Sequence, residues 1–240
     1  MQFDQFLRSA SLKREKVPSF SEYPFSISGI RNMDSLLFHP AVTFFVGDNG
    51  TGKSTLLEAL AVASGLNPEG GSRSFTFSTQ ETHSPLSSYL QLVRGVRRPK
   101  DSYFLRAESF YNVASEIDRL DVTDYYGGVS LHAQSHGESF WSLLTKRFGR
   151  NALYFMDEPE AALSPSRQLS ALAAIHGLVA QGTQFLIATH SPILMAYPNA
   201  IIYLFSKDGI KRVKYEETEH FTVTRGFLNR VEESLKELLA

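Results

Sequence analysis

The stretch that decides the fold is Gly47–Thr55, which reads GDNGTGKST. It follows an apolar run at 42–46 and leads into a helical pattern with Leu56 and Leu60 on one face. A strand, a glycine-rich loop and a helix with the spacing G-x-x-x-x-G-K-[ST] are typical of a phosphate-binding loop. Its backbone N–H groups and the helix N-terminus face an anion. The stretch therefore predicts a nucleoside triphosphate site, where Lys53 reaches the β- and γ-phosphates and Ser54 ligates magnesium.

Composition limits the other possibilities. The chain has 240 residues, 42% of them hydrophobic, which is enough for one large α/β domain with an inserted lobe. A net charge of −1 gives no overall attraction to nucleic acid or membranes. The sequence has no cysteine, so disulfides and thiolate metal sites are excluded. No apolar run reaches the roughly 18 residues of a membrane span, and the first residues lack a secretory pattern. We expect a cytoplasmic protein without a membrane segment of its own.

A second informative stretch is the apolar run Ala152–Met156, which ends in Asp157 and Glu158. A continuous apolar run of this length is typical of a buried parallel strand, and ligands bind outside the carboxyl ends of such strands. We expect Asp157 to complete the magnesium shell with Ser54. Glu158 is then placed to face the water that is in line with the γ-phosphate.

Ser135 and Glu138 have the spacing of a helix capping box. The helix predicted after them has Phe140, Leu144 and Phe148 on one side, so a purely structural interpretation is complete. A capped helix N-terminus beside a glycine is also an anion site. The local sequence leaves both interpretations open.

Three other features carry two interpretations each. His190 follows the predicted buried strand 184–189, where it either contacts a phosphate or the attacking water or is a structural histidine. Gln80 follows a predicted strand at 74–77 and either binds a magnesium-bound water or lies in a solvated loop. The segment Arg94–Lys100 contains four basic residues and is either a phosphate-contact patch or a solvated turn.

Together these stretches resemble the ATP-binding-cassette (ABC) ATPases. Gly47–Ser54 is similar to their Walker A loop, and Ala152–Glu158 to Walker B with its catalytic glutamate. Glu160–Ser164 is similar to the D-loop, His190 to the switch histidine and Gln80 to the Q-loop glutamine.

The ABC signature Leu-Ser-Gly-Gly-Gln has its counterpart at 134–138. Ser135, Gly137 and Glu138 match in kind, while Gln134 replaces the leucine and His136 the first glycine. A glutamate at the end of the signature resembles the chromosome-maintenance and DNA-repair branch more than the transporters. Only about eighty residues separate Walker A from the signature, so the long coiled coil of repair and cohesion ATPases is absent. The chain thus resembles the small stand-alone bacterial ATPases.

The resemblance implies an α/β P-loop NTPase of the ABC type with a mixed β-sheet core. The core lobe is expected at about 1–82 and 150–240, and a small inserted helical lobe with the signature at about 83–149. Two chains would pair head to tail and hydrolyse ATP with Mg²⁺ in composite sites, driving a partner or a nucleic-acid-linked process. The implied site comprises Glu158 and His190 as catalytic residues; Ser54, Asp157 and Gln80 at the metal; and Asp48, Asn49, Gly50, Thr51, Gly52, Lys53, Ser54, Thr55, Ser135, Gly137 and Glu138 around the nucleotide.

Two alternatives remain open. The chain could be the nucleotide-binding subunit of a membrane transporter, although Glu138 argues against it. It could also be a P-loop kinase, but Glu158 and His190 favour water as the acceptor. The expected partners are a second copy of the chain when ATP binds, and nucleic acid or an effector protein.

Further secondary structure follows from periodicity and turn residues. Alternation predicts a strand at 23–28, and a helical pattern covers 89–96. A strand is expected at 103–108, and a hairpin at 201–205 and 210–215. Ser164 and a following proline start a helix whose buried face is predicted to contain Leu169, Leu172, Ile175 and Val179.

Overall fold

The computed structural model describes residues 5–73, 84–126 and 128–240. Its strands form a seven-stranded mixed sheet in the order β10-β9-β3-β8-β7-β6-β4 and a three-stranded antiparallel sheet in the order β2-β1-β5. The strands are β1 (Leu7–Leu12), β2 (Ser35–Leu37), β3 (Val42–Gly47), β4 (Gly71–Ser72), β5 (Leu90–Arg94), β6 (Asp101–Arg106), β7 (Ala152–Asp157), β8 (Gln184–Ala188), β9 (Ile201–Ser206) and β10 (Gly209–Val213).

The helices cover both faces of the large sheet. They are α1 (Ser28–Arg31), α2 (Lys53–Ala63), α3 (Phe110–Arg119), α4 (His136–Ser142), α5 (Pro165–Ala180), α6 (Pro192–Met195), α7 (Glu219–Asn229) and α8 (Val231–Leu238). Short 3₁₀ turns include η2 (Pro85–Tyr89), η6 (Pro159–Ala162) and η7 (Tyr215–Glu217), and α4 continues into a π-helical turn, η5 (Leu143–Arg147).

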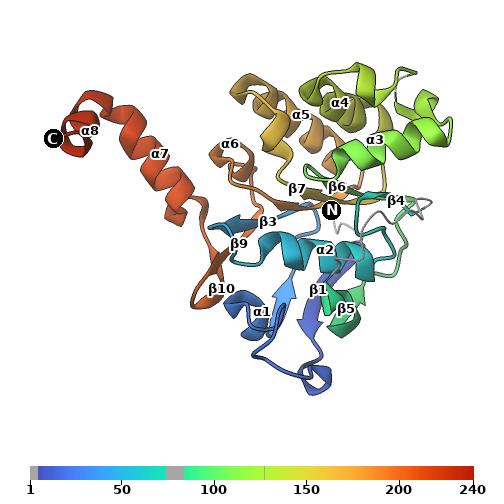
Figure 1. Cartoon of the computed structure of the whole chain (residues 1–240), viewed down its shortest axis with the longest axis horizontal. Helices are drawn as coiled ribbons and strands as arrows, with labels where there is room; N and C mark the ends of the chain where they lie inside the picture. Colours follow the sequence, from blue (N-terminus) through green and yellow to red (C-terminus); the bar gives the residue numbers. More distant parts are fainter. Residues whose placement is uncertain (1–4, 74–83, 127) are drawn as a thin grey trace.

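The molecule is layered around the large sheet (Figure 1). Helices α3, α4 and α5 lie on one face, α2 lies on the other, and the small sheet lies beyond α2. Strands β6, β7, β8, β3 and β9 are parallel, so their carboxyl ends meet at one edge. The phosphate-binding loop leaves β3 at that edge, which is where parallel sheets bind ligands.

The continuous apolar runs exist because both faces of this sheet are buried. Successive residues of a strand point to opposite faces. Phe44 and Tyr154 pack in the core under α3–α5, whereas Phe45 and Phe155 pack in the core around α2. In a parallel sheet covered on both sides neither face meets solvent, so apolar residues do not alternate with solvent-facing polar ones.

Gln184 connects the small sheet to the large one. Its side-chain carbonyl accepts hydrogen bonds from the backbone N–H groups of Phe6 (3.1 Å) and Leu7 (2.9 Å), and its amide group donates to the carbonyls of Leu7 (2.8 Å) and His39 (3.0 Å). All four hydrogen-bonding positions of this buried amide are thereby used. The contacts hold β1 against the start of β8.

The structure corrects three local predictions. Residues 23–28 form turns that lead into α1 rather than a strand, and 90–94 within the predicted helix at 89–96 form strand β5. In helix α5, Ile175 and Val179 are buried as predicted, but Leu169 is 62% exposed. The strand predicted at 74–77 lies outside the described residues.

The segment predicted as the inserted lobe, 83–149, begins with strands. Both β5 and β6 pair within the two sheets, so its helical part starts at α3 and ends with η5. The backbone of these strands finds its hydrogen-bond partners in β1 and β7, which lie far away in the sequence.

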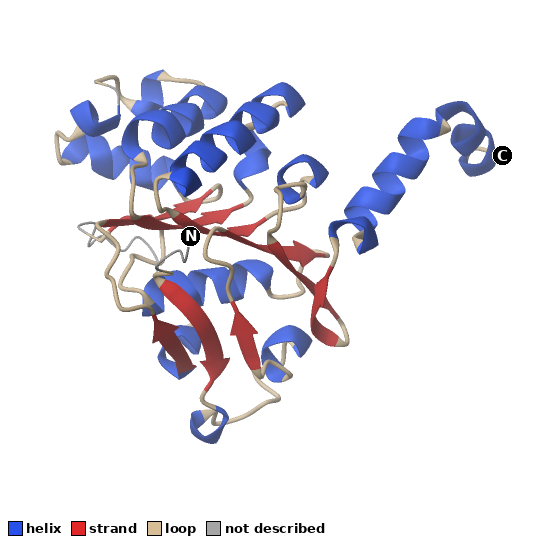
Figure 2. Ribbon diagram, turned by 180° about the vertical axis from the view of Figure 1, so that it is seen from behind, coloured by secondary structure: helices blue, strands red, loops and turns tan. Residues whose placement is uncertain are grey.

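The C-terminal helices α7 and α8 project from the body as an arm, seen from both sides in Figures 1 and 2. From residue 222 onward nearly every side chain of this arm is exposed. In the described ranges, none of the helices is both long enough and apolar enough to cross a membrane.

Candidate functional site

The phosphate-binding loop curls tightly between β3 and α2. Gly47 has φ +134°, and a Cβ there would lie 2.2 Å from the carbonyl oxygen of Phe205 in β9, so no side chain fits. Lys53 is only 4% exposed, and its ammonium group donates to the carbonyls of Gly47 (2.7 Å) and Asp48 (2.9 Å). Burial lowers the pKa of Lys53, while the surrounding carboxylates, Glu158 first, raise it. The loop thus has a buried lysine at its centre.

The other predicted loop residues surround this lysine. Asn49 and Gly50 are exposed, and Gly52 precedes the first turn of α2 in a left-handed conformation. Thr51 closes the loop through its hydroxyl, which donates to the carbonyl of Asp48 at 2.7 Å. Thr55 is half-buried in the first turn of α2. Exposed N–H groups at a helix N-terminus fit the phosphates of a nucleotide.

Ser54 and Asp157 meet across 103 residues of sequence. The Ser54 hydroxyl donates to Asp157 Oδ1 at 2.9 Å. Burial raises the pKa of Asp157 to about 6, although the hydrogen bond from Ser54 and the charge of Arg106 act in the opposite direction. A hydroxyl and a carboxylate oxygen are the ligands that Mg²⁺ prefers, with phosphate oxygens and water completing its octahedron. These two side chains therefore fit a magnesium ion.

Glu158 has an unusual backbone conformation. Its φ of +50° and ψ of +51° place it in the left-handed region, which a residue with a side chain adopts at a cost. Its backbone N–H donates to the carbonyl of Ala188 at 2.9 Å. Its carboxylate is 43% exposed, and Oε1 lies 3.8 Å from Nε2 of His190. The strained residue thus turns a solvent-accessible carboxylate toward the end of β8.

Glu160 connects the two segments that follow β7 and β8. One carboxylate oxygen accepts from the Thr189 hydroxyl at 2.7 Å, and the other accepts from the backbone N–H of His190 at 2.5 Å. Burial raises the pKa of Glu160, and these hydrogen bonds lower it. A change in the segment around η6 would therefore move the backbone of His190.

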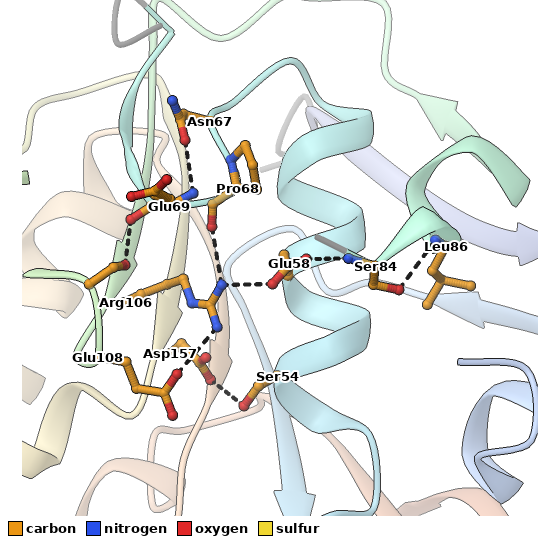
Figure 3. Close-up of polar contacts among 11 residues, drawn as sticks. Ser54, Glu58, Asn67, Pro68, Glu69, Ser84, Leu86, Arg106, Glu108 and Asp157 are labelled. Carbon is orange, nitrogen blue, oxygen red and sulfur yellow. Dashed lines mark hydrogen bonds and ion pairs between the residues drawn. The ribbon is translucent and has the colours of Figure 1, made fainter. Parts of the chain in front are cut away.

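Sequence reasoning missed an arginine beside the predicted magnesium site (Figure 3). Arg106 ends β6, directly opposite Asp157 in the register of β7. Its guanidinium donates to Glu58 (2.7 Å), to the carbonyl of Pro68 (3.2 Å) and to Glu108 (3.5 Å). Glu58 is buried one turn after Ser54 in α2, so the ion pair joins this helix to β6. The only sequence signal was a charged residue at the carboxyl end of a predicted strand.

The capping box of α4 is confirmed. The Ser135 hydroxyl accepts from the backbone N–H of Glu138 at 3.4 Å, and the Glu138 carboxylate accepts from the backbone N–H of Ser135 at 2.9 Å. The Ser135 hydroxyl also donates to this carboxylate at 2.7 Å, and this hydrogen bond, followed by the one from the Ser135 backbone N–H, lowers the pKa of Glu138. A Cβ on Gly137 would lie 2.9 Å from the carbonyl oxygen of Ala162, so α4 approaches η6 closely.

The structure brings Lys53, Ser54, Asp157, Glu158 and His190 to one edge of the sheet. Ser135 is exposed, and in the part of the chain that is described the hydrogen bonds of its side chain stay within the capping box. Gln80 lies outside the described residues. Among those residues, no group of three or more histidine and carboxylate side chains could hold a metal ion by itself.

Comparisons with known proteins give one family match. A family model described as an AAA domain matches residues 25–115, which include the phosphate-binding loop. No curated protein matches the sequence.

Several solved structures are similar to this chain. A nucleotide-free ATP-binding cassette from an ABC transporter is similar with a TM-score of 0.50 and 17% identity, covering 95% of this chain and 98% of that chain. CbiO1 from Clostridium perfringens, part of the ABC transporter complex cbiONQ, has a TM-score of 0.47 and 15% identity, covering 85% and 91%. The SMC head domain from Thermotoga maritima has a TM-score of 0.45 and 15% identity, covering 88% and 99%. The similarity to the nucleotide-free cassette shows that the chain has the fold of an ABC-type P-loop domain.

Proposed function

We propose that this protein binds ATP with Mg²⁺ and hydrolyses it in a head-to-tail dimer. The observation that carries the proposal is the 2.9 Å hydrogen bond between Ser54 and Asp157, since it joins the phosphate-binding loop to the carboxyl end of β7. Lys53 lies at the centre of the same loop. A hydroxyl, a carboxylate and a lysine around one helix N-terminus form the arrangement that P-loop enzymes use for phosphoryl transfer.

Each residue of the site has a proposed role. Lys53 exchanges its two carbonyl partners for the β- and γ-phosphates, and Ser54 and Asp157 hold the metal, together with Gln80. Bound magnesium neutralises charge that develops between the β- and γ-phosphates. Glu158 orients the attacking water and accepts its proton, and His190 donates a hydrogen bond to the γ-phosphate from Nε2.

The second half of each site comes from the other chain. We assign this half to Ser135, Gly137 and Glu138, at the exposed N-terminus of α4. The close approach of Gly137 to Ala162 supports the assignment, since it couples this helix to the segment that follows Glu158. A two-fold dimer would contain two such sites. In this proposal the helical lobe that carries the signature covers α3 to η5, and the two sheets form the core.

Lys53→Ala tests the proposal at its centre. We expect the variant to lose binding of magnesium-ATP and to remain folded, because α2 and β3 are held by apolar cores on both sides. Isothermal titration calorimetry measures the binding, with the exposed Lys146→Ala as the matched control. Equal ATP affinity in Lys53→Ala and the parent protein would contradict the proposal.

The proposed partner of this ATPase is nucleic acid or an effector protein, as in the chromosome-maintenance and DNA-repair branch. A basic groove of about 340 Å³ supports nucleic acid. Arg73, Arg94, Arg97 and Arg98 line it, and none of its described lining residues carries a carboxylate. The groove lies at the amino ends of β6 and β7, at the opposite edge of the sheet from the phosphate-binding loop.

The groove also has a structural explanation. The Arg94 guanidinium donates to the carbonyl of Ala63 at 2.9 Å, and Arg73 donates to that of Ser64 at 3.3 Å, so both satisfy carbonyl groups at the C-terminus of α2. Lys100 lies next to the groove. The arginines therefore either contact phosphates or cap the C-terminus of α2, and binding measurements distinguish these two roles.

If phosphates bind in this groove, DNA affinity should fall steeply with salt. Removing Arg97, Arg98 or Lys100 singly should lower the slope of log K against log salt by about one. Fluorescence anisotropy with labelled duplex measures this, and Arg225→Ala on the projecting arm is the control. Unchanged slopes, or no DNA binding or DNA-stimulated ATPase activity at low salt, would favour the capped helix end.

A nucleotide-binding subunit of a transporter is the alternative function. It predicts co-purification with a membrane protein, whereas the proposal predicts nucleic acid or a second protein.

A further inference from the structure

His190 forms a hydrogen bond that no sequence motif indicated. Its Nδ1 lies 3.0 Å from Nε2 of His220, the second residue of α7. Its Nε2 faces the opposite direction, 3.8 Å from the Glu158 carboxylate. The imidazole of His190 thus bridges the proposed catalytic carboxylate and the base of the C-terminal arm.

The contact restricts the protons on both rings. A hydrogen bond between two neutral imidazoles needs one nitrogen to donate and the other to accept. Burial lowers the pKa of both histidines and so favours their neutral forms; the charge of Lys53 also lowers the pKa of His190, and the charge of His190 lowers that of His220. Either His220 Nε2–H donates to His190 Nδ1, or His190 Nδ1–H donates to His220 Nε2.

The unpartnered nitrogens decide between these two states. Among the described residues, neither His190 Nε2 nor His220 Nδ1 has a hydrogen-bond partner, and both atoms are buried. If His220 donates, the remaining N–H group is on His190 Nε2 and faces the Glu158 carboxylate. If His190 donates, the remaining N–H group is on His220 Nδ1 and stays unpaired. The Glu158 carboxylate attracts an N–H group on His190 Nε2 and repels a nitrogen lone pair at the same position, so the first state is favoured.

The base of the arm is fixed to the segment that carries His190. The buried Thr218 caps α7 and donates from its hydroxyl to the carbonyl of Tyr215 at 2.7 Å. The Tyr215 hydroxyl donates in turn to the carbonyl of Pro192 at 2.8 Å, at the start of α6. Beyond Phe221 the arm is exposed and projects from the body (Figures 1 and 2). These hydrogen bonds hold the first turn of α7, which contains His220, beside the segment of His190.

We propose that His220 is a positioning residue, which holds His190 with its proton on Nε2 for ATP hydrolysis. The inference rests on the proposed function, because His190 acts there through the same Nε2–H group. His220 itself does not touch the nucleotide. In metal sites, a group that hydrogen-bonds one ring nitrogen of a histidine fixes the proton and the orientation of the ring, and His220 acts on His190 in the same way.

Two substitutions separate this role from a packing role. His220→Phe keeps an aromatic ring without nitrogen, and His220→Gln places an amide nitrogen near the position of Nε2. We expect His220→Phe to lower kcat by about 10–100-fold, the usual effect of losing a residue that orients a functional histidine. The Kd for ATP should change less than threefold, and His220→Gln should recover most of the rate. Glu219→Gln, the exposed neighbour, is the control.

The tautomer is measured directly in the full chain with ¹⁵N-labelled histidine. We expect the NMR shifts of nucleotide-free protein to place the His190 proton on Nε2, and His220→Phe to give a mixture of tautomers. A His190 proton on Nδ1 in the parent protein overturns the inference, as does a wild-type rate in His220→Phe. The absence of ATP hydrolysis in the parent protein would contradict the proposed function but not the inference about His220. The tautomer measurement tests that inference independently of hydrolysis.

Discussion

Glu158→Gln is expected to slow ATP hydrolysis by about 10²–10⁴-fold, the contribution of a positioned general base. Glutamine has the same shape, so the hydrogen bond from the residue 158 backbone to Ala188 remains. ATP affinity should stay within a few-fold of the parent value, since Lys53, Ser54 and Asp157 are untouched. Phosphate release at saturating ATP measures the rate, and calorimetry measures the affinity.

Two controls accompany this experiment. Glu15→Gln removes an exposed carboxylate far from the site and should leave the rate unchanged. Glu158→Gly removes the side chain at a position with φ +50°, which glycine adopts at little cost, so hydrolysis should be lost without a lower melting temperature. A turnover within a few-fold of the parent protein in Glu158→Gln would assign the base to another residue.

Ser135→Arg is expected to abolish hydrolysis and ATP-dependent dimerisation while each chain still binds ATP through its own Lys53. Loss of the helix cap alone costs about 1 kcal/mol of stability. The larger effect arises because an arginine at the exposed N-terminus of α4 blocks closure on the other chain. Ser130→Arg is the control, since Ser130 caps a 3₁₀ turn in the same lobe.

Mixing Ser135→Arg chains with Lys53→Ala chains gives the sharper result. In the mixed dimer one composite site carries both substitutions and the other carries neither. Activity should therefore return on mixing, although neither variant hydrolyses ATP alone. Light scattering with ATP measures the dimer, and phosphate release measures the rate. If Ser135→Arg alone keeps the parent rate and only its melting temperature falls, Ser135 is a helix cap and nothing more.

The central elements of the fold were predictable because their signals are local. The strand before Gly47, helix α2 after it and strand β7 each follow from periodicity within a few residues. The capping box of Ser135 and Glu138 was also predicted, because its two hydrogen bonds join residues three positions apart. Whether those two residues also act on nucleotide in another chain stays a prediction.

Other elements depended on partners far away in the sequence. Residues 90–94 have a helical pattern but form β5, because β1 offers them a hydrogen-bond ladder and a place at the small sheet. Leu169 was predicted to be buried and is exposed, since the direction in which α5 faces the sheet is set by packing against α6 and η5. Periodicity identifies the apolar face of a helix, but the neighbouring elements determine which residues of that face are buried.

The sequence alone determined the phosphate-binding loop and the carboxylates at the end of β7, because each is encoded within one short segment. The α/β class followed from these segments taken together. The tertiary structure decided which side chains meet. It placed Arg106 beside Asp157 and His220 against His190, whereas the meeting of Asp157 with Ser54 had been expected from the two motifs. These contacts join residues from different elements, and no local spacing encodes them, because their distances depend on how the whole sheet and its helices pack.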